Sequence, residues 1–145
     1  DLQYLDTGAK VIHAAPHTTS NVNSKSISKS GGTAIYRGVL NIGKNADHSK
    51  ATVSCESLML DQESQSDTIP SITIENDNVD LGHEAKIGRI SDEAIFYLMT
   101  RGISEEEARA MLVRGFVEPI SKELPLEYAV EMNNLITLEL EGSIG

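Results

Sequence analysis

Tryptophan is absent from the 145 residues, and the other aromatic side chains are only four Tyr and two Phe. A single cysteine excludes any disulfide within the chain, which fits a reducing, cytoplasmic compartment. No apolar run approaches the ~20 residues that a membrane-spanning helix needs. With 39% hydrophobic residues and so few aromatics, the chain can build only a thin core. A repetitive β architecture with small interior residues would fit this composition.

Positive charge is also scarce, because the formal net charge is -10. Residues 91–145 hold 4 Lys/Arg against 11 Asp/Glu, whereas residues 1–90 hold 8 against 11. Such a surface repels phosphate backbones and anionic lipids, so we expect neither nucleic acid nor a membrane as a partner. The acidic second part serves either solubility or a docking face. A glycine-rich phosphate loop followed by Lys is missing, which argues against nucleotide binding.

The composition changes once, near residue 90. Residues 1–90 are rich in Ser, Thr, Asn and β-branched residues, whereas residues 91–145 are rich in Glu, Leu, Met and Ala. We therefore predict a β domain over 1–90 and a helical domain over 91–145. Because the chain begins at Asp1 rather than Met, we expect it to be part of a longer protein. Predicted strands cover 10–14, 24–30, 33–42, 51–60, 71–75 and 80–90, and the polar run 61–67 is predicted as a turn between two of them.

Two β architectures compete for the first part. An antiparallel sandwich needs tight hairpin turns, and the Asn-Gly and Asp-Gly pairs typical of them are absent. A β-helix tolerates polar ladders and uneven loops, although no strict sequence repeat supports it. The serines at 24, 26, 28 and 30 fit either a linker or a strand, and their period of two favours a strand.

Three helices are predicted in the second part. Their expected starts are Ser91, which can cap a helix, Ser104, which forms a capping box with Glu107, and Pro125 at a first turn. Their expected ends are Gly102, Pro119 as a helix breaker, and about Glu141.

Cys55, His83 and Glu84 are the candidate residues for chemistry. Taken singly, Cys55 fits a small buried hydrophobe, His83 a hydrogen-bonded core residue and Glu84 a solvated carboxylate. Together their thiolate, imidazole and carboxylate could bind iron or another transition metal, although their spacing matches no local metal motif. His83 shares a strand face with Leu81, Ala85 and Ile87, so Glu84 should point the other way.

Other residues give weaker signals. One cysteine cannot hold a four-thiolate cluster, so any cluster here would need ligands from elsewhere. A cysteine hydrolase pairing Cys55 with a histidine remains a minor alternative, without a family signature around Cys55. His13, His17 and His48 are scattered near predicted turns, and we expect all three on the surface.

Several strings in order resemble one known family over nearly the whole chain. They are GAKVIHAAPHTTS, SKSISKSGGTAIYRG, CESLMLDQESQSDTIP, NDNVDLGHEAKIGRIS, YLMTRGISEEEA and ELPLEYAVEMNNLITLELEGSIG. They are similar to the C-terminal portion of the SufB/SufD family of the SUF iron–sulfur cluster assembly system. Since SufD-type members typically lack the residues matching Cys55 and Glu84, the resemblance is to the SufB type.

The resemblance implies a right-handed parallel β-helix followed by a C-terminal helical domain. It implies a non-enzymatic scaffold that works with a SufD-type subunit and a SufC-type ATPase. The ATPase would dock on helices within residues 92–118, and the SufD-type subunit on the β-helix. Cys55, His83 and Glu84 match residues implicated in building a nascent Fe–S cluster, which we expect to be transient. A structural, SufD-like subunit without a cluster is the alternative.

Two departures from the family pattern affect this expectation. Family members often carry Glu before the HEA string, where this chain has Gly82. The chain also lacks an upstream segment with a cysteine thought to receive sulfur. We therefore expect the isolated chain to assemble clusters poorly. The thiolate of Cys55 would need a lowered pKa to act as a nucleophile.

Overall fold

The computed structural model describes residues 3–140, which divide into two compact units between Arg89 and Ile90. The first unit is built of strands and the second of helices, at the place where the composition changes. The fold is therefore mainly β with a helical C-terminal part, as predicted. That each unit is a separate domain stays a prediction.

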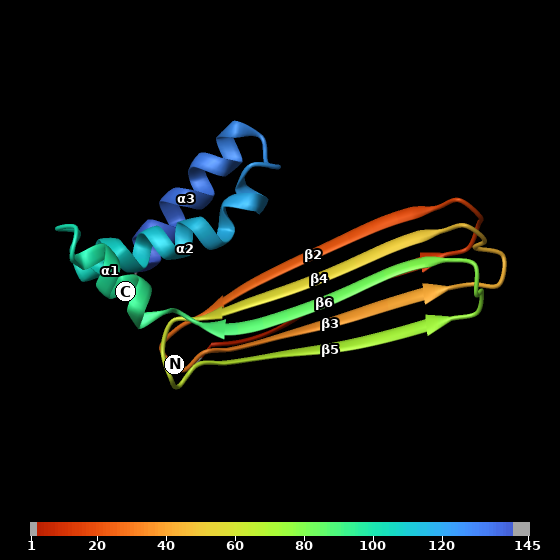
Figure 1. The fold of residues 1–145 in the computed structure, drawn as a ribbon, viewed down its shortest axis with the longest axis horizontal. Helices are drawn as coiled ribbons and strands as arrows, with labels where there is room; N and C mark the ends of the chain where they lie inside the picture. The colour runs from red at the N-terminus through yellow and green to blue at the C-terminus, as the bar shows by residue number, and fades with distance from the viewer. Residues whose placement is uncertain (1–2, 141–145) are drawn as a thin grey trace. The chain divides into compact units, whose positions relative to one another are not determined.

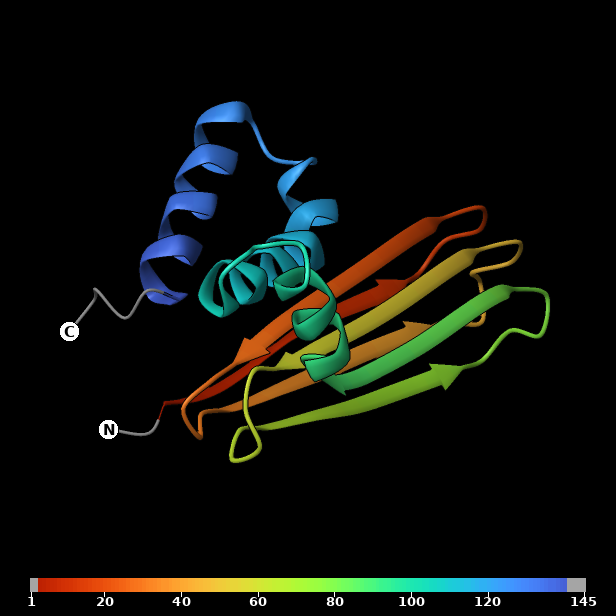
Figure 2. The ribbon, with the colours of Figure 1, turned by 60° about the vertical axis from the view of Figure 1, so that its left-hand side comes forward.

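Within residues 3–140, the first unit has six strands of ten residues in two parallel sheets, and successive strands alternate between them (Figure 1). One sheet has the order β1 (Tyr4–His13), β3 (Thr33–Ile42) and β5 (Gln65–Ile74). The other has the order β2 (Thr19–Ser28), β4 (Lys50–Met59) and β6 (Asp80–Arg89). Figure 2 shows the same strands from a second direction, in which strands of the two sheets alternate down the picture. Parallel pairing of alternate strands is consistent with a β-helix-like fold and excludes the antiparallel sandwich.

Alternation along the strands places small and branched side chains between the two sheets. The core cluster consists of Leu40, Ile42, Ala46, Ala51, Val53 and Cys55. Ile42 is fully buried, and no residue of this cluster is larger than Leu or Ile. The expected thin core with a small-residue interior is confirmed for this unit. β5 and β6 lie at the sheet edges, and most of their residues are exposed.

The predicted strands are present, but three of them are longer at their N-terminal ends. β3 matches its predicted range, whereas β1, β2 and β5 begin about five or six residues earlier than predicted. For β5, the polar residues Gln65, Ser66 and Asp67 suggested a turn. They form strand because they pair in register with Thr33, Ala34 and Ile35 of β3. Backbone pairing overrides the weak strand propensity of these residues.

The serine-rich stretch is a strand and not a linker. The hydroxyl of Ser26 on β2 donates a hydrogen bond to the hydroxyl of Ser57 on β4, and the two oxygens are 2.8 Å apart. β2 ends at Ser28, and Ser30 has a positive φ of 53° in the turn that follows. Ser26 thus pairs with the neighbouring strand, whereas Ser28 Oγ is buried without a hydrogen-bond partner among the described residues.

Three helices form the described part of the second unit: α1 (Asp92–Met99), α2 (Glu105–Ser121) and α3 (Leu126–Leu140). Both predicted serine caps are confirmed, since Ser91 accepts a hydrogen bond from the Ala94 N–H and Ser104 from the Glu107 N–H. Gly102, with φ of +85°, follows α1 as expected. The expected end near Glu141 lies outside the described residues. None of the described helices is long and apolar enough to cross a membrane.

Pro119 does not end its helix, so that prediction is wrong. It lies inside α2, which continues to Ser121. A proline this close to the helix end removes one backbone hydrogen bond but leaves few later turns to disturb. Val113 and Val117, both buried in the same helix, provide packing that offsets the loss.

Candidate functional site

Cys55 lies in the middle of β4 with its side chain directed between the two sheets. It is 3% exposed. Its register neighbours are Ser24 on β2 and Ala85 on β6, both small residues. Val53 and Ser57, two positions away on the same strand, are also buried, as the predicted alternation requires. Cys55 is therefore a buried thiol with small neighbours on both adjacent strands.

His83 lies on β6 directly opposite Val53, so it shares the inward face of the sheet with Cys55. Both residues line one cavity between the sheets. The remaining lining is mostly apolar and includes Val22, Leu40, Val53, Pro70 and Ile72. Cys55 is buried whereas His83 and Pro70 are exposed. The cavity therefore extends from the buried sulfur to the exposed edge strands β5 and β6.

Burial raises the pKa of the Cys55 thiol. The lowered pKa that a nucleophilic Cys55 would need is therefore not provided by the described residues, because an apolar cavity disfavours the charged form. At neutral pH the resting residue is a protonated thiol. Its reaction as a nucleophile or metal ligand requires a group that stabilises the sulfur anion, such as a cation or a hydrogen-bond donor.

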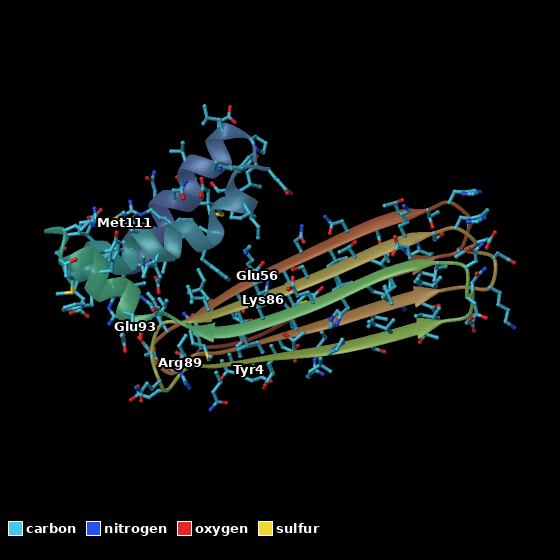
Figure 3. The ribbon with its side chains drawn as sticks, in the orientation of Figure 1. Tyr4, Glu56, Lys86, Arg89, Glu93 and Met111 are labelled. Atoms are coloured by element: carbon cyan, nitrogen blue, oxygen red, sulfur yellow. The ribbon has the colours of Figure 1, made fainter. Side chains whose placement is uncertain are left out.

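Glu84 lies on the outer face of β6, away from Cys55 and His83. Its carboxylate pairs with Lys86, whose Nζ is 2.9 Å from Glu84 Oε1. Lys86 lies in turn beside Glu56 of β4, its register neighbour (Figure 3). Glu56 pairs with Lys25 of β2 at 2.8 Å. The structure thus brings Cys55 and His83 to one cavity and places Glu84 in a row of charges outside it.

Gly82 shares the outward side of β6 with Glu84. A Cβ built at Gly82 would meet only Thr52 Cγ2, at 3.7 Å, which is ordinary contact. A larger side chain would therefore fit there. The carboxylate that the resemblance led us to expect at this position would stand outside the cavity beside Glu84 and not next to the sulfur.

A complete metal site is not formed by the described residues alone. Residues 3–140 contain no group of three or more His, Cys, Asp or Glu side chains able to hold a metal ion. Cys55 and His83 offer one thiol and one imidazole, which suits two of the ligands of an iron or zinc ion. The remaining ligands would have to come from another chain or from the cargo itself.

The other histidines differ from one another. His13 was expected on the surface, but it is 3% exposed. Its ring nitrogens lie 2.6 Å from Thr18 Oγ1 and 2.8 Å from Ser20 Oγ. These hydrogen bonds offset the free-energy cost of burying the imidazole. His17 and His48 are exposed and stack with ring centroids 5.2 Å apart.

Tyr36 is a cavity residue that sequence reasoning did not single out. It lies on β3 and lines the same cavity as Cys55 and His83. Its hydroxyl oxygen is buried without a hydrogen-bond partner among the described residues. One signal in the sequence could have identified it. Tyr36 lies an even number of residues from Leu40 and Ile42, so the three share the apolar face of the predicted strand.

Comparison with known proteins gives concordant matches. Residues 1–116 match the family model described as SUF system FeS cluster assembly, SufBD core domain. An iron–sulfur cluster assembly SufBD family protein of Staphylococcus haemolyticus is 58% identical over 143 residues, 99% of this chain and 31% of the relative. The iron–sulfur cluster assembly protein SufB of Bacillus subtilis is 57% identical with the same coverage. The chain thus spans about a third of the length of these relatives. Both the family model and the relatives show that this chain belongs to the SufBD family of the SUF iron–sulfur cluster assembly system.

Proposed function

We propose that the chain is the C-terminal part of a SufB-type scaffold on which a nascent Fe–S cluster is assembled. One observation carries the proposal: Cys55 and His83, on neighbouring strands, line a single cavity that reaches the exposed edge of the β unit. A scaffold needs ligands that hold iron and sulfur and a path by which they leave. The protein would not be an enzyme, and it would work in the cytoplasm.

The proposed fold of the longer protein is a right-handed parallel β-helix. Support comes from the strands, which alternate between two parallel sheets and pair in register over their whole length. In such a stack each inward position is repeated in the next turn, so the interior forms a continuous column. The cavity beside Cys55 would be one part of that column.

The chemistry follows from the two donors. Cys55, once deprotonated, would take the outer sulfur of a donor persulfide, whose thiolate leaves, or would ligate iron. Neutral His83 would ligate the same iron through a ring nitrogen. The Fe–S cluster is the cargo, and its remaining ligands would come from a partner. Glu84 would ligate or take up a proton only at a subunit boundary, since it lies on the outer face and is paired with Lys86. Its release from Lys86 would be required first.

Two partners are proposed. A SufD-type subunit would pair with the β unit, whose edge strands β5 and β6 expose Ile69, Ile72, Ile74 and Ile87. Unpaired strand edges with apolar side chains favour pairing with another chain. A SufC-type ATPase would dock on residues 92–118, where α1 exposes Phe96, Tyr97 and Met99 and α2 begins with three exposed glutamates. Exposed aromatic and methionine side chains are typical of interfaces.

The experiment replaces Cys55 by Ser in the full-length protein and measures cluster formation together with binding of both partners. The expected result is loss of the cluster's visible absorption and of cluster transfer to an apo-acceptor, at least tenfold, while pull-downs still retain the SufD-type subunit and the ATPase. The oxygen of Ser is a poor substitute for sulfur as an iron ligand, yet it is close to it in size.

Ser57→Ala is the matched control, since Ser57 is two residues away on the same inward face and is also buried. This variant should assemble clusters as the wild type does. Unchanged maturation in Cys55→Ser would favour the structural, SufD-like reading. Failure of the wild-type protein to retain either partner would contradict the proposed docking of that partner.

A further inference from the structure

β6 is the open edge of its sheet, and one side of its backbone has no partner strand among residues 3–140. The sheet order is β2, β4 and β6, so β6 is paired on the β4 side only. The Asp80 N–H donates to the carbonyl of Ser49, just before β4, so the even-numbered residues of β6 turn toward β4. Because the register is unbroken over ten residues, the odd-numbered residues turn their N–H and C=O groups toward the open edge.

The edge of the other sheet is interrupted in its middle. Gln65, the first residue of β5, donates its N–H to the carbonyl of Gly32, just before β3, so the odd-numbered residues of β5 face β3. Pro70 is even-numbered and therefore faces the open edge. Proline has no N–H, so a strand added beside β5 would lose a hydrogen bond in the middle of its ladder. The continuous edge for an added strand is thus that of β6.

The outer face of the β6 sheet carries a row of alternating charges. Lys25 of β2, Glu56 of β4 and Lys86 of β6 are register neighbours across the three strands. Lys25 pairs with Glu56 at 2.8 Å, and Lys86 follows on the next strand (Figure 3). Opposite charges at facing strand positions stabilise a sheet, whereas like charges destabilise it. A further strand beside β6 would continue this row with an acidic residue opposite Lys86.

The sequence of β6 itself supplies such a strand. Around Ala85 the residues are arranged symmetrically, with Glu84 before it and Lys86 after it. Gly82 and Gly88 follow at equal distances on either side. In an antiparallel pair of two copies centred on Ala85, Glu84 lies opposite the partner's Lys86, and Lys86 opposite the partner's Glu84. Gly82 lies opposite the partner's Gly88.

We propose that β6 pairs antiparallel with β6 of a second copy of this chain, about a twofold axis at Ala85. The proposal goes beyond the proposed function, because it needs neither a cluster nor a SufD-type subunit. The odd-numbered residues, whose backbone groups face the open edge, would form the hydrogen-bonded pairs. Among them, the exposed Ile87 would lie opposite the partner's His83. A self-complementary surface of this kind is what a twofold interface requires.

The charges specify one register of this pair. A centre at Glu84 would place two glutamates directly opposite each other, and a centre at Lys86 would place two lysines there. Both arrangements are unfavourable. A slip of one residue would set backbone groups that face the open edge against groups that face β4, and the interchain hydrogen bonds would be lost.

The test measures the oligomeric state of the full-length protein, without other subunits, by sedimentation velocity over a concentration series. The wild type should form a dimer. Glu84→Lys and Lys86→Glu, each made alone, replace both interchain ion pairs by like-charge pairs and should raise the dimer dissociation constant at least about tenfold. Lys44→Glu, which makes the same charge change at an exposed residue of the turn after β3, should dimerise as the wild type does.

A mixture of the two β6 variants tests the register. Each Lys86→Glu chain carries two acidic residues at these positions, and each Glu84→Lys chain carries two basic ones. An antiparallel pair of the two different chains therefore regains both ion pairs, and the mixture should form a dimer with about the wild-type dissociation constant. The proposal would be overturned by a monomeric wild type, by wild-type dimerisation of either single variant, or by a mixture that stays monomeric.

Disulfide trapping gives the deciding measurement if the charge variants fail to fold. A Cβ at Gly82 would meet only Thr52 Cγ2, at 3.7 Å, and one at Gly88 would meet nothing within 4 Å, so both positions accept cysteine. Opposed residues of this kind of antiparallel pair have Cα atoms about 4.5 Å apart, within the range of a disulfide.

Mixed Gly82→Cys and Gly88→Cys chains should therefore form a disulfide between these two positions under mild oxidation, identified by peptide mass spectrometry. Neither variant alone should link to its own copy at that position. A mixture without this disulfide, or an equally fast link within either variant alone, would overturn the proposal.

The outcome is distinguishable from that of the proposed function. Loss of cluster formation in Cys55→Ser together with a monomeric wild type would reject only the pairing through β6. Wild-type cluster formation in Cys55→Ser would reject the proposed function, whatever the oligomeric state shows.

Discussion

The β unit and the helical unit use their apolar residues in different ways. In the β unit, Leu40, Ile42, Ala51 and Val53 are buried between two sheets, and the same interior holds Cys55. In the helical unit, α3 has no buried residue, and Leu126, Tyr128 and Val130 are exposed along it. In the β unit, the strand register sets which residues lie next to Cys55 and His83. In the helical unit, apolar and acidic side chains of the helices face outward. The comparison shows that the buried thiol belongs to the β unit, whereas α3 of the helical unit keeps its apolar side chains at the surface.

The largest loss of stability is expected from removing a core side chain of the β unit. Ile42→Ala removes a fully buried side chain and should lower the free energy of unfolding of this unit by about 3 kcal/mol. Val113→Ala, which changes a residue 1% exposed in α2, should cost the helical unit about 2 kcal/mol. Hydrogen exchange followed by mass spectrometry reports the stability of each unit separately.

Each of these variants should leave the other unit unaffected, since each unit has its own buried residues. Exchange in residues 92–140 should therefore match the wild type in Ile42→Ala. Equal acceleration of exchange in both units by either substitution would show that they unfold together, and the comparison would fail.

Smaller losses of stability are expected from changes at two side chains whose oxygens accept backbone hydrogen bonds. Asp61 in the β unit accepts from the backbone N–H groups of Ser30, Glu63 and Ser64, and Ser104 accepts from Glu107 at the start of α2. Asp61→Asn and Ser104→Ala should each cost about 1 kcal/mol at neutral pH. Urea unfolding monitored in each unit checks both values.

Of these two losses of stability, only that of Asp61→Asn should depend on pH. Burial acts to raise the pKa of Asp61, but the hydrogen bonds from Ser64, Ser30 and Glu63 outweigh it, and the pKa lies below its ordinary value. A folded-state pKa below the unfolded value of about 3.9 stabilises the protein above that pH. The stabilisation is lost as the pH falls through the folded-state pKa.

The difference between the wild type and Asp61→Asn should therefore shrink in acid, whereas that between the wild type and Ser104→Ala should persist until the helical unit unfolds. A difference for Asp61→Asn that stays constant down to pH values well below about 3.9 would contradict this account.

The sequence was sufficient where a local pattern decides the structure. Alternation predicted β3 over its whole length and placed His83 and Glu84 on opposite faces of β6. Side-chain chemistry predicted the caps at Ser91 and Ser104. In each of these places the neighbours that matter lie within a few residues along the chain.

The sequence was insufficient where a residue's structure depends on another residue that is distant along the chain. Gln65 belongs to β5 because it pairs with Thr33 of β3, and polar composition alone suggested a turn there. The burial of His13 depends on two hydroxyls that the chain brings to it by turning between β1 and β2. The raised pKa of Cys55 likewise depends on the facing sheet, which no local pattern describes.

The most direct test of a shared iron site at Cys55 and His83 is X-ray absorption at the iron edge, on the full-length protein with its partners and a nascent cluster bound. We predict that His83→Ala removes one imidazole scatterer from the iron shell, and that Cys55→Ser retains too little iron for the wild-type shell, with its sulfur scatterers, to be observed. Glu84→Gln, at the outer face, should leave the imidazole and sulfur scatterers in place. An iron shell that is the same in the wild type, Cys55→Ser and His83→Ala would contradict the account, because the cluster would then be bound elsewhere.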